Sequence, residues 1–410
     1  MTKYVIIGNG VAGVNAANWI RREDSDGIIE IYTDEKYLSY ARPKLPGYIA
    51  DIVEFQDLFT RKEEWYKEKD IDLHLSSKVI DINNKKKIIE IENGKRVKYD
   101  KLLIAAGSHA FIPPIEGADK EKVMTIRTIE DSKKLKEIMK KNEKVVVIGG
   151  GLLGIETANS INMQGNDVTI VEFLPRLLPK QLDEDGASLL KSLLEKKGIK
   201  IVIGAETEKI LGEEQIEGVK LKSDKIFPAD CVVISTGIRP NVHIANKCDV
   251  KCNRGVVVNK YMETSQPDIY AAGDIAEFDG RVWGIIPVAF AQSKVAAINM
   301  VHGRKEEYEE VVPSNTLKVT DIDLTSIGKI FFEKIPENII QKKIIDRDKG
   351  IYKKVVLERK DGNLIPIGAI LLGDKTNSFE IQKLIREKID VSEFADEMLK
   401  IETDLKKFIN

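Results

Sequence analysis

The chain has 410 residues, of which 42% are hydrophobic, and this length predicts two or three domains rather than one compact core. Its net charge of -2 argues against a nucleic-acid-binding or membrane-surface protein, and no apolar run approaches the ~18 residues of a membrane-spanning helix. The three cysteines, Cys231, Cys248 and Cys252, fit a reducing cytoplasm, and the scattered histidines lack the spacing of metal ligands, so we expect a cytoplasmic protein without a metal site.

Residues 4–35 read as a strand, a glycine-rich turn, a helix and a second strand, and no signal-peptide pattern precedes them. The turn contains Gly8, Gly10 and Gly13 in the pattern G-x-G-x-x-G. In this pattern the first glycine makes a tight turn, the second admits a pyrophosphate, and the third lets the helix pack on the strand. The phosphates are expected at the positive end of the helix.

The second strand ends in two acidic residues, Asp34 and Glu35, which lie 21 and 22 positions after Gly13. A carboxylate about 20 residues past the fingerprint can hold the ribose of a dinucleotide. We therefore expect one of the pair to bind ribose, the alternative being an ordinary acidic turn.

Residues 78–104 read as three short strands joined by turns, over 78–82, 87–91 and 97–104. They end at small residues, Ala105 to Ser108, that let the backbone approach a ligand. A linker follows at 109–118, and a helix is expected over 131–141.

A second fingerprint, Gly149, Gly151 and Gly154, lies about 140 residues after the first and again opens a helix behind a buried strand. Two such sites indicate two dinucleotides with electron transfer between them. The next strand ends at Glu172, and a carboxylate there accepts the 2′-hydroxyl of NADH but repels the 2′-phosphate of NADPH. Arg176 lies four residues further on and weakens this preference; the alternative for Glu172 is a solvated strand end.

The strand at 269–272 runs into Gly273-Asp274, and a helix is expected over 287–301. Residues 311–410 read as several strands followed by helices near 377–387 and 392–400. The fold class is α/β, with two Rossmann-like dinucleotide-binding domains and a smaller α+β C-terminal domain.

Five motifs in one order resemble those of the two-dinucleotide pyridine nucleotide-disulfide reductase superfamily. They are Gly8-x-Gly10-x-x-Gly13, Ala105-Ala106-Gly107-Ser108, Gly149-x-Gly151-x-x-Gly154-x-Glu156, Thr236-Gly237-x-Arg239-Pro240-Asn241, and Thr264-Ser265-x-Pro267-x-Ile269-Tyr270-Ala271-Ala272-Gly273-Asp274. The resemblance implies FAD in the first Rossmann unit and NAD(P)H in the second. It gives an FAD-binding domain in two parts, 1–110 and 239–308, an NAD-binding domain at 111–238 and a C-terminal domain at 309–410.

The resemblance also implies which residues bind the cofactors. For FAD they are Gly8, Gly10, Ala12, Gly13, Asp34, Glu35, Arg42, Val79, Ala106, Arg127, Asp274 and Ile286. For NAD they are Gly149, Gly151, Leu153, Gly154, Glu156, Glu172 and Gly237. Asp274 would bond the ribitol, the Val79 backbone would meet the adenine, and the helix after Pro287 would point its positive end at the flavin pyrimidine. Arg127 could instead form a surface ion pair with Glu130 or Asp131.

The segment 38–50, where disulfide reductases of this superfamily carry redox cysteines, contains none, and no C-x-x-C occurs in the chain. A thiol relay is therefore excluded. The pattern Tyr40-x-Arg42-Pro43-x-Leu45-x-x-Tyr48-Ile49 instead resembles NADH:rubredoxin reductases and the flavoprotein domains of assimilatory nitrite reductases. Many ferredoxin-reducing relatives pair a lysine with the glutamate that matches Glu156, but here Leu45-Pro46-Gly47 replaces that motif, so Lys44 or Arg42 could substitute.

The resemblance implies a FAD-dependent oxidoreductase that takes hydride from NADH and passes electrons singly to a small acidic carrier protein, rubredoxin or ferredoxin. We expect no catalytic side chain, because the flavin carries the chemistry, although Glu156 and Lys44 could lie near it. The alternatives are an NADH oxidase that reduces oxygen, a ferredoxin reductase, a flavoprotein partner of a nitrite reductase, and a non-catalytic redox sensor.

Overall fold

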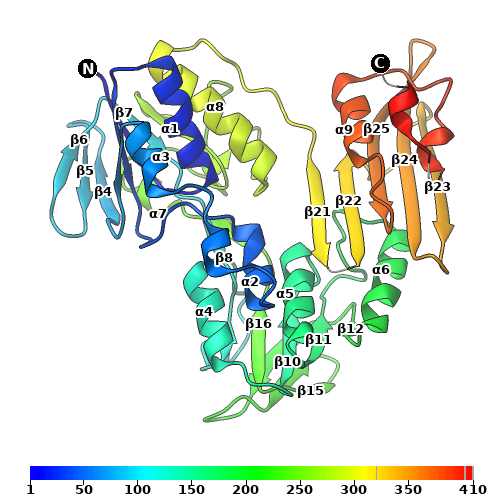
Figure 1. Cartoon of the computed structure of the whole chain (residues 1–410). Coiled ribbons are helices and arrows are strands. Elements are labelled where there is room, and N and C mark those ends of the chain that lie inside the picture. The colour runs from blue at the N-terminus through cyan, green and yellow to red at the C-terminus, as the bar shows by residue number, and fades with distance from the viewer. Residues whose placement is uncertain (320, 401–402, 409–410) are drawn as a thin grey trace. The chain divides into compact units, whose positions relative to one another are not determined.

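The computed structural model describes residues 1–319, 321–400 and 403–408 (Figure 1). The chain divides into two compact units. The first unit comprises Met1–Lys44, Val53–Ala110 and Ile238–Val311, and the second comprises Leu45–Ile52, Phe111–Gly237 and Val312–Asn410. None of the helices in the described part of the chain is long and apolar enough to cross a membrane.

A five-stranded parallel sheet forms the centre of the first unit. Its order is β19 (Ile269–Ala271), β7 (Lys101–Ile104), β1 (Lys3–Ile7), β2 (Ile28–Tyr32) and β3 (Ile71–His74). The strands are nearly continuous apolar runs, because both faces of a parallel sheet are covered. Helices α1 (Val11–Glu23) and α8 (Ile286–His302) pack against each other beside this sheet (Figure 1). The predicted strand, turn and helix at the N-terminus and the helix near 287–301 are confirmed.

The remaining elements of the first unit are short. They are α3 (Glu63–Glu68), α7 (His243–Asn246), β4 (Val79–Asn83), β5 (Ile88–Ile91), β6 (Arg96–Lys98), β8 (Ser108–Ala110), β17 (Ile238–Pro240), β18 (Val256–Val257) and β20 (Ala276–Glu277), with 3₁₀ turns at Arg42–Lys44 and Phe55–Leu58. The antiparallel meander is β4, β5 and β6. The prediction of one strand over 97–104 is wrong. The chain leaves the meander at Asp100, whose backbone N–H donates to the carbonyl of Lys3, and continues as β7 of the parallel sheet.

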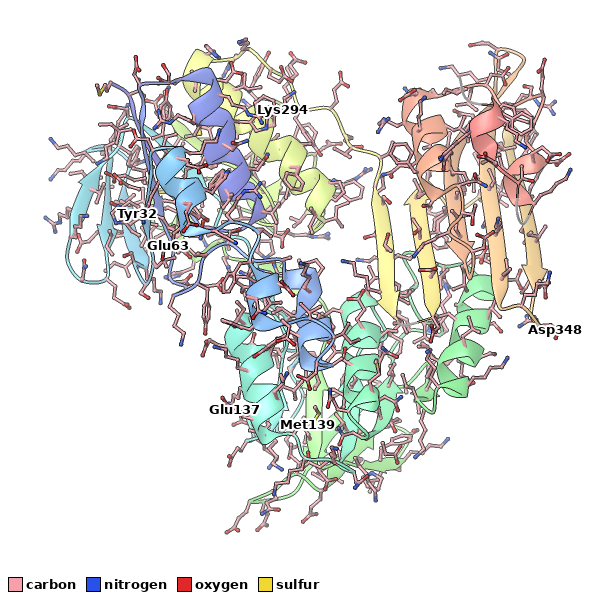
Figure 2. All side chains as sticks on the ribbon, in the orientation of Figure 1. Tyr32, Glu63, Glu137, Met139, Lys294 and Asp348 are labelled. Atoms are coloured by element: carbon pink, nitrogen blue, oxygen red, sulfur yellow. The ribbon has the colours of Figure 1, made fainter. Side chains whose placement is uncertain are left out.

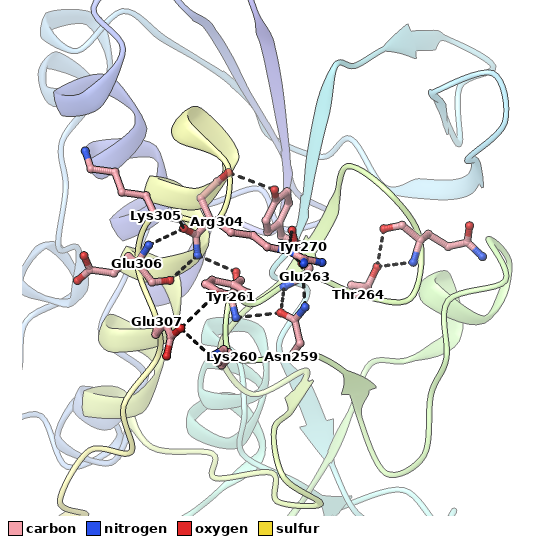
Figure 3. Close-up of polar contacts among 12 residues, drawn as sticks. Asn259, Lys260, Tyr261, Glu263, Thr264, Tyr270, Arg304, Lys305, Glu306 and Glu307 are labelled. Carbon is pink, nitrogen blue, oxygen red and sulfur yellow. Dashed lines mark hydrogen bonds and ion pairs between the residues drawn. The ribbon is translucent and has the colours of Figure 1, made fainter.

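A buried amide closes the first unit where α8 ends. Asn299 is fully buried; its Oδ1 accepts from the backbone of Lys305 and Glu306, and its Nδ2 donates to the carbonyls of Tyr261 and Glu306. Figure 3 shows the surrounding contacts, including the ion pair between Arg304 and Glu263. The last turn of α8 and the 259–264 loop are thus fixed together.

The second unit repeats the arrangement around its own parallel sheet. The order is β12 (Lys200–Val202), β11 (Asp167–Val171), β10 (Lys144–Ile148), β16 (Cys231–Ile234) and β9 (Val123–Met124). A small antiparallel sheet contains β13 (Thr207–Leu211), β14 (Gly218–Leu221) and β15 (Ile226–Pro228), and the helices are α2 (Leu45–Ile49), α4 (Ile129–Ile138), α5 (Leu152–Met163) and α6 (Glu184–Lys196). A capping box of Thr128 and Asp131 starts α4, two residues before the predicted helix.

The C-terminal part of the second unit is an antiparallel sheet, yellow to orange in Figure 1, followed by α9 (Ser378–Glu387). Its order is β21 (Ser314–Val319), β22 (Ile322–Gly328), β25 (Asn363–Leu372), β24 (Ile351–Lys360) and β23 (Ile339–Asp346). The helix predicted over 392–400 is wrong: the segment forms turns and a 3₁₀ helix at Glu397–Leu399. The Asp390 carboxylate accepts from the backbone of Leu364 and Ser392, which holds the start of this segment against β25.

One carboxylate connects the antiparallel sheet to α6. Asp183 caps the helix by accepting from Gly186, and it also accepts from the Tyr352 hydroxyl at 2.6 Å and from Lys354 Nζ at 2.9 Å. Tyr352 and Lys354 lie on β24 and are buried. The sheet and the helix therefore share a partly buried ion pair.

Candidate cofactor-binding sites

The three glycines of the first fingerprint have different surroundings. Gly8 has φ +110°, and a Cβ there would lie 2.3 Å from the Ala105 carbonyl oxygen. A Cβ on Gly13 would lie 1.9 Å from the Gly8 oxygen, whereas one on Gly10, the N-cap of α1, would meet nothing within 4 Å. The first and third glycines thus allow close packing, and the second leaves an open cradle at a helix N-terminus, which fits a phosphate.

The second fingerprint repeats this geometry. Gly149 has φ +118° and its Cβ would lie 2.2 Å from the Ser235 oxygen; a Cβ on Gly154 would lie 2.1 Å from the Gly149 oxygen; and Gly151 faces open space. Gly237, with φ +113°, is also open. The second unit therefore contains a cradle of the same kind, at the start of α5.

The loop after β2 separates the two acidic candidates of the first unit. Arg42 pairs with Glu35 at 2.6 Å and donates to the Tyr40 hydroxyl, which donates in turn to Glu35. Burial lowers the pKa of Arg42, but Tyr40, Glu35 and Asp274 outweigh burial, so its pKa is raised and the guanidinium stays charged. Asp34 is exposed. Glu35 is therefore held in an ion pair, and Asp34 remains accessible.

The same loop is hydrogen-bonded to the segment that precedes Val79, the first residue of β4. Thr33 N–H donates to the His74 carbonyl, and Ser77 N–H donates to the Thr33 carbonyl. Tyr32, the last residue of β2 and labelled in Figure 2, stacks on His74 with ring centroids 4.4 Å apart. The two segments predicted to meet the adenosine are thus brought together.

The Gly273-Asp274 motif lies against the first fingerprint. A Cβ on Gly273 would lie 2.9 Å from the Cβ of Ala12, and the Asp274 carboxylate accepts from the Ser108 hydroxyl at 2.8 Å. Gly273 N–H donates to Gln292 of α8, which is buried. Gly273, which directly precedes Asp274, therefore packs against Ala12 of the first fingerprint.

Three supporting residues were not predicted from the sequence: Ser108, Gln292 and Asn241. Asn241 Nδ2 donates to the Ala106 carbonyl at 2.7 Å across 135 positions. Ser108 and Asn241 belong to two of the motifs seen in the sequence, so the sequence did contain a signal that could have identified them. Gln292 had none beyond its place on a predicted helix.

Glu172 follows β11 and is buried, with only 8% of its surface exposed. Its carboxylate accepts from the backbone of Gly150 at 2.5 Å, inside the fingerprint, and from Leu174 at 2.7 Å. It is therefore no solvated strand end. Arg176 donates to the carbonyls of Leu182 and Pro179, so its guanidinium is bound by its own loop.

Glu156 on α5 is also buried, and its Oε1 accepts from the backbone N–H of Lys318 on β21 at 2.7 Å. Burial raises the pKa of Glu156 to about 7, although the Lys318 N–H opposes the rise. Of the two cations considered as partners, Lys44 donates to the Asp57 carbonyl and Arg42 pairs with Glu35. The partner found for Glu156 is thus a backbone group of the C-terminal sheet.

Three other candidates lie on element boundaries. Ile286 is the first residue of α8 and Leu153 the second of α5. Arg127 belongs to the second unit, where its backbone N–H donates to the Asp131 carboxylate.

The cysteines are free and poorly suited to redox chemistry. Burial raises the pKa of Cys231 to about 12 and of Cys248 to about 11, and it also raises the pKa of Cys252. Thiols react as thiolates, so these environments suppress reactivity. Among the described residues, no group of His, Cys, Asp and Glu is arranged to hold a metal ion.

Two parallel sheets, each with a glycine cradle at a helix N-terminus, define a protein that binds two dinucleotides. The family model for pyridine nucleotide-disulphide oxidoreductases matches residues 2–295, and that for the rubredoxin NAD+ reductase C-terminal domain matches residues 313–389. The chain therefore belongs to the pyridine nucleotide-disulphide oxidoreductase family, whose members use FAD and NAD(P)H. The predicted family and fold class are confirmed.

Several characterised proteins resemble the chain. A nitrite reductase [NAD(P)H] of Bacillus subtilis is 36% identical over 392 residues, 95% of this chain and 48% of its own length. An NADH oxidase of Methanocaldococcus jannaschii is 33% identical, covering 96% of this chain and 93% of the relative. An NADH-rubredoxin oxidoreductase of Clostridium acetobutylicum is 33% identical, covering 91% and 93%. The crystal structure of NADH:rubredoxin oxidoreductase from that organism superposes with a TM-score of 0.76 at 31% identity, over 96% of this chain and 97% of the other. The chain spans about half the length of the nitrite reductase it matches.

Proposed function

We propose that this protein is a FAD-dependent oxidoreductase that takes hydride from NADH and passes electrons singly to a small acidic electron carrier, with rubredoxin as the preferred partner. The observation that carries the proposal is the pair of glycine cradles, one in each unit, because two bound dinucleotides allow hydride transfer between them. The Clostridium acetobutylicum relative supports the choice of acceptor, since the two chains match over nine-tenths of their lengths.

FAD would occupy the domain formed by residues 1–110 and 239–308, and NADH the domain at 111–238, with 309–410 as a smaller α+β C-terminal domain. When bound, FAD supplies hydride acceptance and one-electron release. The open space at Gly10 would take its pyrophosphate, and Asp274 its ribitol. Asp34 is the better candidate for the ribose, because Glu35 is occupied by Arg42. Val79, Ala106 and Ile286 would line the remainder of the FAD site.

The NADH preference rests on Glu172 and Arg176. A buried carboxylate beside the Gly151 cradle can accept the 2′-hydroxyl of the adenosine ribose and disfavours a 2′-phosphate. The only arginine in the adjoining loop 173–182, Arg176, binds its own loop carbonyls and is poorly placed to neutralise that phosphate. Gly149, Leu153, Gly154, Glu156 and Gly237 complete the proposed NADH site.

Other acceptors have weaker support. Direct reduction of oxygen is supported by the likeness to an NADH oxidase. Electron transfer to a nitrite reductase is supported by the likeness to a nitrite reductase of which this chain spans about half the length. The raised pKa values of all three cysteines disfavour a thiol acceptor. A non-catalytic sensor would bind both nucleotides without turnover.

Stopped-flow spectroscopy tests the proposal. The purified protein is expected to contain one FAD per chain, to bleach on mixing with NADH, and to recover its colour when rubredoxin is added under anaerobic conditions. The kcat/KM values for rubredoxin, ferredoxin and oxygen, measured with NADH saturating, then rank the acceptors. A higher value for oxygen would favour the oxidase, and bleaching without recovery by any acceptor would favour the sensor.

A further inference from the structure

The first fingerprint contains a buried amide with one half unpaired. Asn9 lies between Gly8 and Gly10 and exposes only 7% of its surface. Its Oδ1 accepts from the Tyr66 hydroxyl at 2.9 Å, whereas its Nδ2 is buried and has no hydrogen-bond partner among the described residues. A buried donor without an acceptor is costly, so an acceptor from outside the chain is expected.

The orientation of the amide follows from Tyr66. Burial raises the pKa of Tyr66, and the hydrogen bond to Asn9 and the nearby backbone of Ser39 oppose the rise. The hydroxyl donates its proton to Asn9 Oδ1, the acceptor end of the amide. Nδ2 is left as the free end of the amide.

The second fingerprint has no counterpart to Asn9. Its equivalent position is Gly150, where a Cβ would lie 2.6 Å from Leu177 and where the backbone N–H is bound by Glu172. The strand-turn-helix geometry thus forms without an asparagine side chain. The motif therefore does not need an asparagine to fold, and folding alone does not account for the unpaired Nδ2 of Asn9.

We propose that Asn9 Nδ2 donates a hydrogen bond to an oxygen of the ADP half of bound FAD, with Tyr66 as the positioning residue that orients the amide. The inference rests on the assignment of FAD to the first unit. The ADP half is the part concerned, because the second glycine of a G-x-G-x-x-G turn admits a pyrophosphate and Asn9 directly precedes that glycine, Gly10. Phosphate and ribose oxygens of this half both accept hydrogen bonds.

Deflavinated protein reconstituted with FAD provides the test, with Kd measured by fluorescence titration. Asn9→Ala should weaken FAD binding by about 5- to 100-fold. Asn9→Asp keeps the acceptor for Tyr66 but replaces the donor by a carboxylate, so it should weaken binding at least as much. Tyr66→Phe frees the amide to rotate and should have a smaller effect. The matched control is Tyr99→Phe, which removes another buried, unpartnered polar group of the same unit and should leave the Kd unchanged.

Fragments of the cofactor locate the contact. Asn9→Ala should weaken the binding of ADP by the same factor as FAD and should leave riboflavin binding unchanged. Wild-type Kd values for FAD in both Asn9 variants, or a loss confined to riboflavin, would overturn the inference. Should Asn9→Ala fail to fold, the isosteric Asn9→Asp decides by the same measurement. A wild-type protein that does not bind FAD would instead overturn the assigned cofactor itself.

Discussion

At the scale of single residues, three acidic groups of the second unit, two buried and one partly buried, have different environments. Glu172 accepts two backbone N–H groups, Asp183 accepts from a lysine and a tyrosine side chain, and Glu156 accepts one backbone N–H, that of Lys318. Hydrogen bonds and cations favour the charged form of a carboxyl group, and burial disfavours it. Burial raises the pKa of Glu156 to about 7, whereas the effect of burial on Asp183 is outweighed by the hydrogen bonds from Tyr352 and Lys354, which hold its pKa below its ordinary value.

Glu156 should therefore make stability depend on pH. Its pKa is raised from 4.5 in the unfolded chain to about 7 in the folded one, so its contribution is fully present below about pH 4.5 and is lost as the pH rises through 7. Glu156→Gln keeps the acceptor for Lys318 and should be more stable than the wild type by up to about 3 kcal/mol above pH 7, with the difference vanishing near pH 4.5. Urea unfolding of the FAD-loaded protein across this range measures it.

The matched control is Glu137→Gln on α4, an exposed residue labelled in Figure 2. Its stability curve should run parallel to that of the wild type. A Glu156→Gln curve that is also parallel would contradict the raised pKa.

Glu172 should determine which nicotinamide cofactor is used. Glu172→Gln removes the negative charge that opposes a 2′-phosphate, so the ratio of kcat/KM values for NADH and NADPH should fall by about tenfold or more. Arg176→Gln serves as the comparison, because this arginine is bound by loop carbonyls and its loss should leave the ratio nearly unchanged. A wild-type protein that prefers NADPH would contradict the role assigned to Glu172.

At the scale of elements, the two repeated strand-turn-helix units were predictable because their signals are local. Apolar runs, glycine spacing and the acids after the second strands fix each unit within about 30 residues. The split of 97–104 into β6 and β7 was not predictable, because it depends on pairing with Lys3, a residue remote in sequence. The failure of the helix over 392–400 has the same origin in the contact of Asp390 with β25.

The binding sites divide along the same line. Motif spacing predicts cofactor-binding roles for the fingerprint glycines and Glu172, the family resemblance predicts one for Asp274, and these roles stay predictions. The sequence offered no means to choose Asp34 over Glu35, because the ion pair with Arg42 depends on how the 35–42 loop folds. The partner of Glu156 on α5 is Lys318 on β21, 162 positions away, and this contact could not be inferred from the local sequence pattern.

The junction of α6 with β24 should be sensitive to loss of one charge. Asp183→Asn leaves Lys354, only 7% exposed, without its anion and should lower the free energy of unfolding by about 3–5 kcal/mol. Asp185→Asn, two residues away, removes the partner of the well-exposed Lys343 and should cost about 1 kcal/mol or less. Denaturant midpoints of the two variants provide the comparison, and equal losses would contradict a special role for Asp183.

At the scale of the whole molecule, the proposed reaction needs an encounter with a second protein. The chain is nearly neutral, so attraction of an acidic carrier depends on local rather than net charge. Lys44 is exposed in the segment for which the family resemblance predicts a place beside the flavin, and its Nζ donates to the backbone carbonyl of Asp57. Local positive charge of this kind raises association rates more than affinities.

Lys44→Glu should accordingly lower kcat/KM for rubredoxin while leaving the rate of flavin reduction by NADH unchanged. The wild-type rate should fall with ionic strength, because the Debye length shrinks from about 10 Å at 0.1 M to about 3 Å at 1 M. Lys85→Glu, an equal change of charge at an exposed turn of the meander, is the control. A rubredoxin rate indifferent to salt and to Lys44 would argue against steering at this place.

Asn9 and Gly150 occupy the same position of the two fingerprints, and this difference bears on how the chain could be redesigned. The two fingerprints are copies of one motif, yet at this position one carries a side chain and the other excludes it. In Gly150→Asn the new Cβ would clash with Leu177. In Asn9→Gly the Tyr66 hydroxyl would lose its hydrogen-bond acceptor. The two fingerprints are therefore not interchangeable at this one position. An engineered exchange of their cofactor preferences would have to rebuild the surroundings of positions 9 and 150 as well as the acidic residue after the second strand of each unit.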